Sequence, residues 1–335
     1  MASKDTSDQA TKLVGREKAS ANFDLTSDVL ASKLHDQIVG KTVLITGVSP
    51  TGLGAHAAAV IAEHSPKLLI LASRRLSAIT PVIDSIVASV SQPPRIVPLE
   101  LDLASQSSVR KAAAELLKLT PVVDVLINNA GVMMLQDYAT TPEGVEMHLA
   151  INHVGHFLFT NLIMSALLGS PQPRVINITS AAYFGSPIRF DDLNLRYGKD
   201  YEPFVAYAQS KTANLLFSLG LVRKLGAKGL LSFGVDPGGV AGTGINRAIP
   251  MSDQIKRGWR LEDGSPNPAI PWKTPAQSVA SYIMAAFDPD IKDHNGETIA
   301  AGIFDEGVAP HAKDPEDADK LWTVSEKLVG QEFAY

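Results

Sequence analysis

VLITGVSPTGLG, residues 43–54, is the stretch of sequence that decides the fold. Its first four residues form a short apolar run typical of a buried strand, and the small residues of 52–64 then predict a helix. Glycines at such a junction permit a tight turn and let the backbone approach a pyrophosphate, which the amides of the helix N-terminus would bind. The alternative is a turn that binds no ligand. The residues expected to contact a cofactor here are Gly47, Ser49, Thr51, Gly52, Leu53 and Gly54.

Further along the chain, apolar strand runs alternate with helical segments. The predicted strands cover residues 68–72, 95–100, 122–127, 174–179 and 230–235. The predicted helices cover residues 81–91, 105–119, 142–168 and 204–226. Strands that are apolar throughout and alternate with helices predict an α/β fold, in which right-handed crossovers cover both faces of a parallel sheet. No break in composition marks a second domain, so we predict one domain over residues 21–335.

The composition excludes several kinds of protein. The 335 residues carry a net charge of −5 and no block of Lys and Arg, which argues against a nucleic-acid partner. The absence of cysteine excludes disulfides, thiolate nucleophiles and cysteine-bound zinc, and no other residues have convincing metal spacing. Residues 1–20 are predicted to be a flexible tail, and residues 21–40 either a short outer helix or a partly ordered leader. Without a signal-like segment or an apolar stretch of ~18 residues, we expect a cytoplasmic protein with no membrane span.

The second predicted strand ends in Ser73, Arg74 and Arg75. Sites that prefer NAD place an acid at this point to bind the ribose hydroxyls, but no acid lies between residues 66 and 83. Arginine suits a 2′-phosphate because it makes charge-assisted and often bidentate contacts. The alternative is a solvated arginine pair at a strand end. We therefore predict NADP(H) as the cofactor.

Polar and small residues follow the third and fourth predicted strands as well. Asp102, next to Leu103, would accept a hydrogen bond from an adenine amino group; the alternative is a turn aspartate, with Ser105 the better helix cap. The small residues Asn129, Ala130 and Gly131 would let the chain pass close to the adenine ribose. Taken alone, the same residues would indicate an Asn-Gly type of turn.

Tyr207 and Lys211 are four residues apart, so they share one face of a predicted helix. A tyrosine has a pKa of about 10, which a neighbouring ammonium would lower by stabilising the phenolate. The spacing also occurs by chance in surface helices. Its context raises its significance, because Ser180 ends one strand, Pro237 follows the next, and Asn152 lies in the preceding helix. Ligands of doubly wound sheets bind at the carboxyl ends of the strands, so one crevice would collect these residues.

Together these motifs resemble the short-chain dehydrogenase/reductase family over residues 40–330. TG(x)4GLG, NNAG, the helix asparagine, the strand-end serine, YxxxK and PGG occur in the order of that family. The 26 residues between Ser180 and Tyr207 resemble the longer loop of the branch containing retinol dehydrogenases and the WW-domain oxidoreductase. The ending at residues 314–322 resembles fungal members of that branch. The resemblance implies a single Rossmann-type, doubly wound sheet of about seven strands in the order 3-2-1-4-5-6-7.

The resemblance also implies roles for individual residues. Tyr207 would be the general acid in reduction, Lys211 would hold the nicotinamide ribose, and Ser180 would hydrogen-bond the substrate oxygen. Asn152 would hold a water that relays protons from Lys211. The residues expected to flank the nicotinamide are Pro237, Gly238, Val240 and Thr243. The chain departs from the common pattern in two places, since the glycine turn is one residue longer, at Thr51, and Thr243 comes one residue late.

These observations predict an NADP(H)-dependent oxidoreductase that interconverts a carbonyl and an alcohol on a lipophilic small molecule. Resemblance to the fungal members implies a role in secondary metabolism, and the family also implies a possible homodimer. Alternatives are a carbon–carbon double-bond reductase, a redox-neutral isomerase, or a non-catalytic NADP(H) sensor. Residues 244–273 are predicted to form a loop or two short helices that cover the substrate. The residues expected opposite them are Met133, Met134, Tyr183 and Phe184, whereas His153 and His156 are expected to pack or face solvent.

Overall fold

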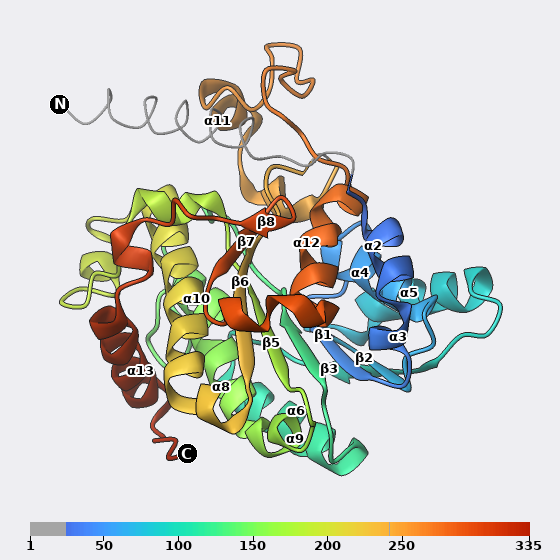
Figure 1. The fold of residues 1–335 in the computed structure, drawn as a ribbon. Coiled ribbons are helices and arrows are strands. Elements are labelled where there is room, and N and C mark those ends of the chain that lie inside the picture. The colour runs from blue at the N-terminus through green and yellow to red at the C-terminus, as the bar shows by residue number, and fades with distance from the viewer. Residues whose placement is uncertain (1–24, 241) are drawn as a thin grey trace.

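In the computed structural model, residues 25–240 and 242–335 are described, and they contain one eight-stranded sheet with helices on both faces (Figure 1). The predicted tail of residues 1–20 and the first four residues of the predicted leader lie outside the described residues. The strands are β1 (Thr42–Thr46), β2 (Leu68–Ser73), β3 (Arg95–Glu100), β4 (Val125–Asn128), β5 (Arg174–Ile178), β6 (Leu231–Asp236), β7 (Thr298–Ala300) and β8 (Ile303–Phe304).

The sheet order is β3-β2-β1-β4-β5-β6-β7-β8. The first seven strands are parallel, which confirms the predicted α/β fold and the predicted order 3-2-1-4-5-6-7. The eighth strand was not predicted, and it pairs antiparallel with β7 at the sheet edge. Two residues are too few to carry an alternating pattern, so a strand of this length leaves no periodic signal in the sequence.

Buried side chains on the two faces of the sheet form two separate apolar clusters. Leu44 and Leu126 belong to one cluster, whereas their neighbours Val43 and Ile127 belong to the other. This explains why the strands are apolar throughout. One face is covered by α2 (Ser27–Lys33), α3 (His35–Ile38), α4 (Leu53–Ala62), α5 (Leu76–Ser89) and α12 (Pro275–Phe287). The other is covered by α6 (Gln106–Leu119), α8 (Gly155–Leu162), α9 (Met164–Leu168), α10 (Pro203–Leu225) and α13 (Pro315–Val329) (Figure 1).

Several of these helices begin at a residue whose side chain caps the first turn. Ser105 Oγ accepts from Ser108 N at 3.3 Å, which confirms the predicted cap of α6. Glu202 accepts from Val205 N at 2.7 Å at the start of α10. Thr274 forms a reciprocal capping box at the start of α12. Each cap satisfies amides that a helix leaves unpaired at its N-terminus.

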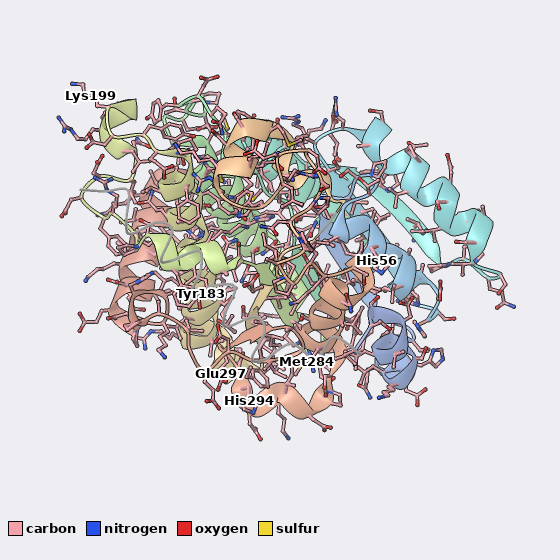
Figure 2. The ribbon with its side chains drawn as sticks, turned by 90° about the horizontal axis from the view of Figure 1, so that it is seen from above. His56, Tyr183, Lys199, Met284, His294 and Glu297 are labelled. Carbon is pink, nitrogen blue, oxygen red and sulfur yellow. The ribbon has the colours of Figure 1, made fainter. Side chains whose placement is uncertain are left out.

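The leader segment forms two short helices, α2 and α3, against the outside of α4 and α12. Ala31 and Ile38 are fully buried in the apolar cluster on the face of the sheet that α4 and α12 cover. Ser27 Oγ lies 3.1 Å from His56 Nε2 of α4, and Met284 of α12 packs against the same cluster (Figure 2). The predicted outer helix is therefore present among the described residues. Among all the residues that the structure describes, no helix is long and apolar enough to cross a membrane.

The predicted helix of residues 142–168 differs most from the structure. Residues 140–146 form a turn closed by a bridge between Thr140 and Glu146, and the helix starts with α7 (Met147–Leu149). A π-helical turn, η1 (Ala150–Val154), follows and contains Asn152. Such turns are rare and occur often at functional sites. Helix α5 also starts earlier than predicted and contains Pro81 within it.

Residues 244–273 form the 3₁₀ turn η5 (Gly244–Ala248) and the helix α11 (Met251–Lys256), joined by loops. This matches the prediction of two short helices. The other short helical turns are η2 (Ala181–Gly185), η3 (Leu195–Gly198), η4 (Gly226–Lys228), η6 (Pro289–His294) and η7 (Pro310–Ala312).

We predict that Gly155→Ala destabilises the protein although alanine favours a helix by about 1 kcal/mol. A Cβ at Gly155 would lie 2.5 Å from the carbonyl oxygen of Leu103, so α8 and the loop after β3 would have to separate. We expect the free energy of unfolding, measured by urea denaturation, to fall by about 2 kcal/mol. Gly226→Ala is the control because its nearest neighbours would lie at 3.4 Å or more. Equal stabilities of the two variants would contradict this packing.

Candidate functional site

The loops that follow β1 and β4 meet at the carboxyl edge of the sheet. Gly47 has φ +73°, and a Cβ there would lie 2.5 Å from Ala130 Cα. A Cβ at Gly54 would lie 2.6 Å from Asn129 Nδ2. The glycine turn and the NNAG segment therefore interlock: backbone atoms require glycine at position 47, and a side chain at position 54 would displace the Asn129 amide.

Thr46, the last residue of β1, joins these loops to the helix of Asn152. Its Oγ1 accepts from the amides of Asn129 and Ala130, both at 3.0 Å, and lies 2.9 Å from His156 Nε2. The other ring nitrogen of His156 faces the Asn152 carbonyl oxygen at 3.2 Å and must donate to it. Thr46 was not singled out by the sequence analysis. A threonine in place of an aliphatic residue at the end of a buried strand was the available signal.

His153 and His156 are both buried, so of the two predicted alternatives packing is correct. Burial lowers the pKa of His153 to about 3 and that of His156 to about 4. Both rings are therefore neutral near pH 7, and neither is poised to exchange protons.

The residues expected at the adenosine end of a cofactor lie along the same edge. Arg74 and Arg75 are exposed at the end of β2, and neither pairs with an acid in residues 25–240 or 242–335. Both guanidinium groups are thus available for an anion. One oxygen of Asp102 accepts from Ala104 N at 3.0 Å, which is the turn contact considered as an alternative.

The four predicted catalytic side chains converge at the end of β5. The Tyr207 hydroxyl faces the Ser180 side chain closely enough for that side chain to influence its pKa, and Lys211 Nζ lies 5.6 Å from the centre of the Tyr207 ring. Lys211 Nζ also donates to the Ile178 carbonyl oxygen at 3.0 Å. A Cβ at Gly131 would lie 3.2 Å from Asn152 Oδ1 and 3.6 Å from Lys211 Nζ. Glycine thereby leaves the approach to both groups open.

The Asn152 side chain is fully engaged by protein atoms. Its Oδ1 accepts from Val132 N at 2.9 Å, and its Nδ2 donates to the Val132 carbonyl oxygen at 3.0 Å. The same Nδ2 donates at 2.8 Å to Ser210 Oγ, which in turn donates to the Tyr207 carbonyl oxygen at 2.7 Å. Asn152 thus ties the NNAG loop to the tyrosine helix α10. The water relay implied for it by resemblance stays a prediction.

Burial controls the proton affinities of the tyrosine and the lysine. Burial raises the pKa of Tyr207, while its hydrogen bond to Ser180 opposes the rise. This direction is opposite to the expected lowering by Lys211, because the loss of water around the phenolate dominates and the negative charge of Asp236 adds to the rise. Burial also lowers the pKa of Lys211 to about 8, against the opposing effect of Asp236. Tyr207 is therefore held protonated, as a proton donor must be.

Asp236 and Lys273 are both buried near the PGG turn, and neither was singled out from the sequence. Asp236 Oδ1 accepts from Gly238 N at 2.9 Å. Burial raises the pKa of Asp236, and the charge of Lys273 opposes that rise. A Cβ at Gly238, where φ is +75°, would lie 2.7 Å from Lys273 Nζ. Lys273 also pairs with Val240 through a backbone bridge, so it fixes the loop expected to flank the nicotinamide. Thr243 stands at the start of η5.

An apolar cluster surrounds the Tyr207 ring. Its buried members are Met134, Ala182, Tyr207 and Ile249, with Met133, Phe204 and Trp259 packed against them. Ile249 and Trp259 come from the segment 244–273, as predicted for a substrate cover. Tyr183 and Phe184 do not take part, because Tyr183 packs in a separate cluster with Leu215 and Val308. The expectation that they form the opposite wall is therefore wrong.

This arrangement fits a nicotinamide dinucleotide. The turn before α4 presents helix amides, the arginines at β2 are unpaired, and Gly131 leaves space before Lys211 and Asn152. In the described part of the chain, no three His, Asp or Glu side chains are grouped to hold a metal ion. The fold and the site thus define an oxidoreductase of the Rossmann type.

Comparison with known proteins assigns the family. The profile described as short chain dehydrogenase matches residues 41–190. The chain is 35% identical to the short-chain dehydrogenase/reductase prx1 of Penicillium rubens, with 88% of this chain and 86% of the relative covered. It is 36% identical to human retinol dehydrogenase 13, with 88% and 86% covered. It is 38% identical to the oxidoreductase fscI of Fusarium equiseti, with 65% and 95% covered. The protein belongs to the short-chain dehydrogenase/reductase family, whose members use nicotinamide cofactors.

Solved structures agree on the fold. An uncharacterized protein from Mycobacterium paratuberculosis superposes with a TM-score of 0.66 at 30% identity, covering 89% of this chain and 96% of that one. A short chain dehydrogenase from Escherichia coli CFT073, solved with NADPH, gives a TM-score of 0.59 at 21% identity over 80% and 99% of the two chains.

The lowered pKa of Lys211 predicts a specific dependence of stability on pH. Between pH 8 and the ordinary value of 10.5, the unfolded chain binds this proton and the folded chain does not, so folding becomes more favourable as pH rises. We expect the stability of the wild type relative to Lys211→Met to increase by about 1–2 kcal/mol between about pH 7 and about pH 9.5. Urea denaturation at both pH values measures this. Exposed Lys228→Met is the control, and identical pH profiles for Lys211→Met and the wild type would contradict the assignment.

Proposed function

We propose that this protein is an NADP(H)-dependent oxidoreductase that interconverts a carbonyl and an alcohol on a lipophilic small molecule. One observation carries the proposal: the Tyr207 hydroxyl, the Ser180 side chain and the Lys211 ammonium converge at the carboxyl end of β5. A pure dinucleotide sensor has no need of this buried polar set. Its presence favours catalysis over binding alone.

In the reduction direction, Ser180 donates a hydrogen bond to the substrate carbonyl oxygen and holds it beside Tyr207. The bound nicotinamide supplies the hydride that reaches the carbonyl carbon. Tyr207 donates its hydroxyl proton to the carbonyl oxygen as the C=O bond becomes C–O, so the product is the alcohol. The raised pKa of Tyr207 keeps that proton in place until negative charge develops on the oxygen.

Lys211 stabilises the phenolate that Tyr207 leaves behind, because its ammonium lies near the ring in a site with little water. A lysine whose pKa is about 8 is charged in most molecules at pH 7, yet its proton is held less tightly than usual. It is thus suited to return a proton to the tyrosine. In the proposal, Asn152 holds a water that relays protons from Lys211.

The choice of NADP(H) rests on the arginines at the end of β2. They are exposed, they are not neutralised by an acid in the described residues, and they occupy the position where an acid would bind the ribose of NAD. The apolar cluster around Tyr207 supports a lipophilic substrate. The cytoplasmic location, the homodimer and the role in secondary metabolism stay predictions.

We predict that Tyr207→Phe reduces the turnover of NADPH with a ketone or aldehyde by at least about 1,000-fold, since it removes the proton donor. NADPH affinity, measured by fluorescence titration, should change by less than about threefold. Tyr197→Phe is the matched control because Tyr197 is 78% exposed. A fully active Tyr207→Phe protein would refute the mechanism.

We predict that Arg74→Ala weakens NADPH binding by about 10- to 100-fold, the loss expected for a charge-assisted contact of about 1.5–3 kcal/mol. The affinity for NADH should stay nearly constant, because NADH lacks the 2′-phosphate. Arg95→Ala provides the control, since Arg95 is exposed at the start of β3, on the edge of the sheet opposite to Arg74. An equal loss of NADPH and NADH affinity would argue against phosphate recognition by Arg74.

A further inference from the structure

The segment after the NNAG loop brings Met134 against the catalytic tyrosine. Met134 is 2% exposed and shares its apolar cluster with Tyr207, Ala182 and Ile249. Its backbone lies in the left-handed region, at φ +48°. For a residue with a Cβ this conformation costs about 1–2 kcal/mol, so neighbouring groups must hold it in place.

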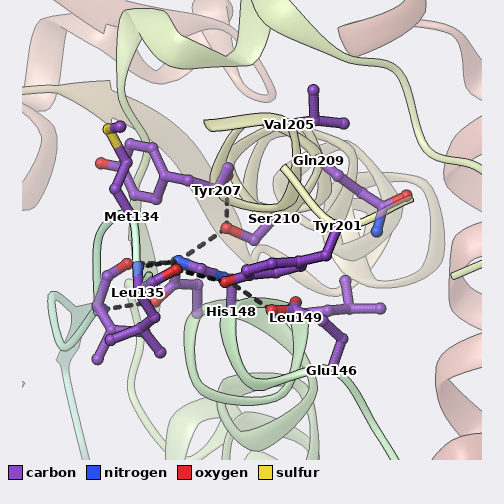
Figure 3. A network of polar contacts seen from close by, with 12 residues as sticks. Met134, Leu135, Glu146, His148, Leu149, Tyr201, Val205, Tyr207, Gln209 and Ser210 are labelled. Atoms are coloured by element: carbon purple, nitrogen blue, oxygen red, sulfur yellow. Dashed lines mark hydrogen bonds and ion pairs between the residues drawn. The ribbon is translucent and has the colours of Figure 1, made fainter. Parts of the chain in front are cut away.

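Both backbone polar groups of the next residue, Leu135, are held by side chains from distant elements (Figure 3). Leu135 N donates to His148 Nε2 at 3.1 Å. The Tyr201 hydroxyl donates to the Leu135 carbonyl oxygen at 2.6 Å. The first bond holds the peptide between Met134 and Leu135, and the second holds the peptide that follows Leu135. Together they fix Leu135 and thereby restrain the unfavourable conformation of Met134.

The hydrogen bonds around His148 determine its tautomer. Because Nε2 accepts from an amide, the ring proton must be on Nδ1, which lies 2.8 Å from Glu146 Oε1 and donates to it. Glu146 Oε2 accepts in turn from Leu149 N at 2.9 Å. The side chains of His148 and Glu146 are both completely buried. Glu146 thus fixes the tautomer and the orientation in which His148 can accept from Leu135.

The same residues also contact the tyrosine helix. The His148 ring lies 6.2 Å from the Tyr207 ring in an edge-on arrangement and 6.4 Å from the Tyr201 ring. Both nitrogens of His148 are already bonded, so the ring has no free group for the substrate. His148 therefore acts through position, not through chemistry at the reacting atoms.

Tyr201 belongs to the long loop between Ser180 and Tyr207, and that loop is anchored to the Glu146 turn. Asn194 Oδ1 accepts from Glu146 N and Asn194 Nδ2 donates to the Gly144 carbonyl oxygen, both at 2.9 Å. Three successive residues of the loop, 195–197, also have positive φ. The loop is thus held in one conformation that delivers the Tyr201 hydroxyl to Leu135.

From this geometry we infer that Glu146, His148 and Tyr201 form a clamp on Leu135 that sets the position of Met134 beside Tyr207. The clamp residues are positioning residues, and Met134 determines which substrates fit. This inference rests on the proposed carbonyl–alcohol function for its consequence in catalysis. The clamp itself is a statement about the backbone of residues 134–135 and can be tested without turnover.

The first measurement is hydrogen–deuterium exchange of a peptide spanning residues 132–137, followed by mass spectrometry. We expect Tyr201→Phe and His148→Leu each to raise its exchange rate by about 10-fold or more, since each removes one of the two bonds to Leu135. His148→Gln restores an acceptor of similar reach and should return the rate toward that of the wild type. Tyr197→Phe, in the same loop but exposed, is the control. Unchanged exchange in both Tyr201→Phe and His148→Leu would overturn the clamp.

The second measurement is selectivity between butanal and decanal, two aldehydes that differ only in chain length. We expect Tyr201→Phe to change the ratio of their kcat/KM values by about fivefold or more, with NADPH affinity unchanged. In a Met134→Ala background, the same Tyr201→Phe change should leave the ratio constant, because the clamp acts through Met134.

The two measurements separate the inference from the proposed function. If Tyr201→Phe changes the ratio of kcat/KM values equally in the wild-type and Met134→Ala backgrounds, the role of Met134 is refuted. A wild-type protein that reduces neither aldehyde would count against the proposed function for these substrates, and the exchange rates would then decide the clamp alone. Loss of thermal stability without altered exchange or selectivity would show that His148 and Tyr201 serve only folding.

Discussion

The contact between two backbone loops at the centre of the sheet is the constraint on which the site depends. The strand order reverses between β1 and β4, so the loops leaving these strands border the crevice at the carboxyl edge. There Gly47 packs against the backbone of Ala130, and Thr46 Oγ1 accepts from the amides of Asn129 and Ala130. A glycine that sequence patterns associate with a phosphate is thus also a packing residue. The turn proposed to hold the cofactor and the packing of the two loops depend on the same few atoms.

Burial then decides how the catalytic groups hold their protons. Tyr207 and Lys211 lie four residues apart on one helix, yet the removal of water affects each more than its partner does. It raises the pKa of the tyrosine and lowers that of the lysine, so the two proton affinities move apart and the tyrosinate becomes the stronger base of the two. One hydrophobic environment thus keeps the proton on Tyr207 and makes Lys211 able to return a proton to it. The buried side chains of Asp236 and Lys273 both adjoin Gly238 of the PGG turn nearby.

Much of the fold was predictable because its signals are local. The apolar runs of β1 to β6, the cap at Ser105 and the order of the motifs all lie within short stretches of sequence. The two-residue strand β8 and the π turn around Asn152 were not predicted, because both arise from tertiary contacts and not from periodicity. The raised pKa of Tyr207 was not predicted either, because it too arises from tertiary contacts that bury the ring. Spacing reveals its partner Lys211 but not how completely water is excluded.

The residues that surround the catalytic set were hardest to find, because they act through backbone atoms far away in the sequence. Nothing near His148 indicates that its ring accepts from Leu135, and nothing near Tyr201 indicates its reach across 66 residues. Surface loops can be lengthened at a small entropic cost, whereas strands of a sheet cannot. A selectivity element held by a loop tyrosine can therefore change while Tyr207, Lys211 and Ser180 stay in place. Under the proposed function, the long loop separates the choice of substrate from the chemistry performed on it.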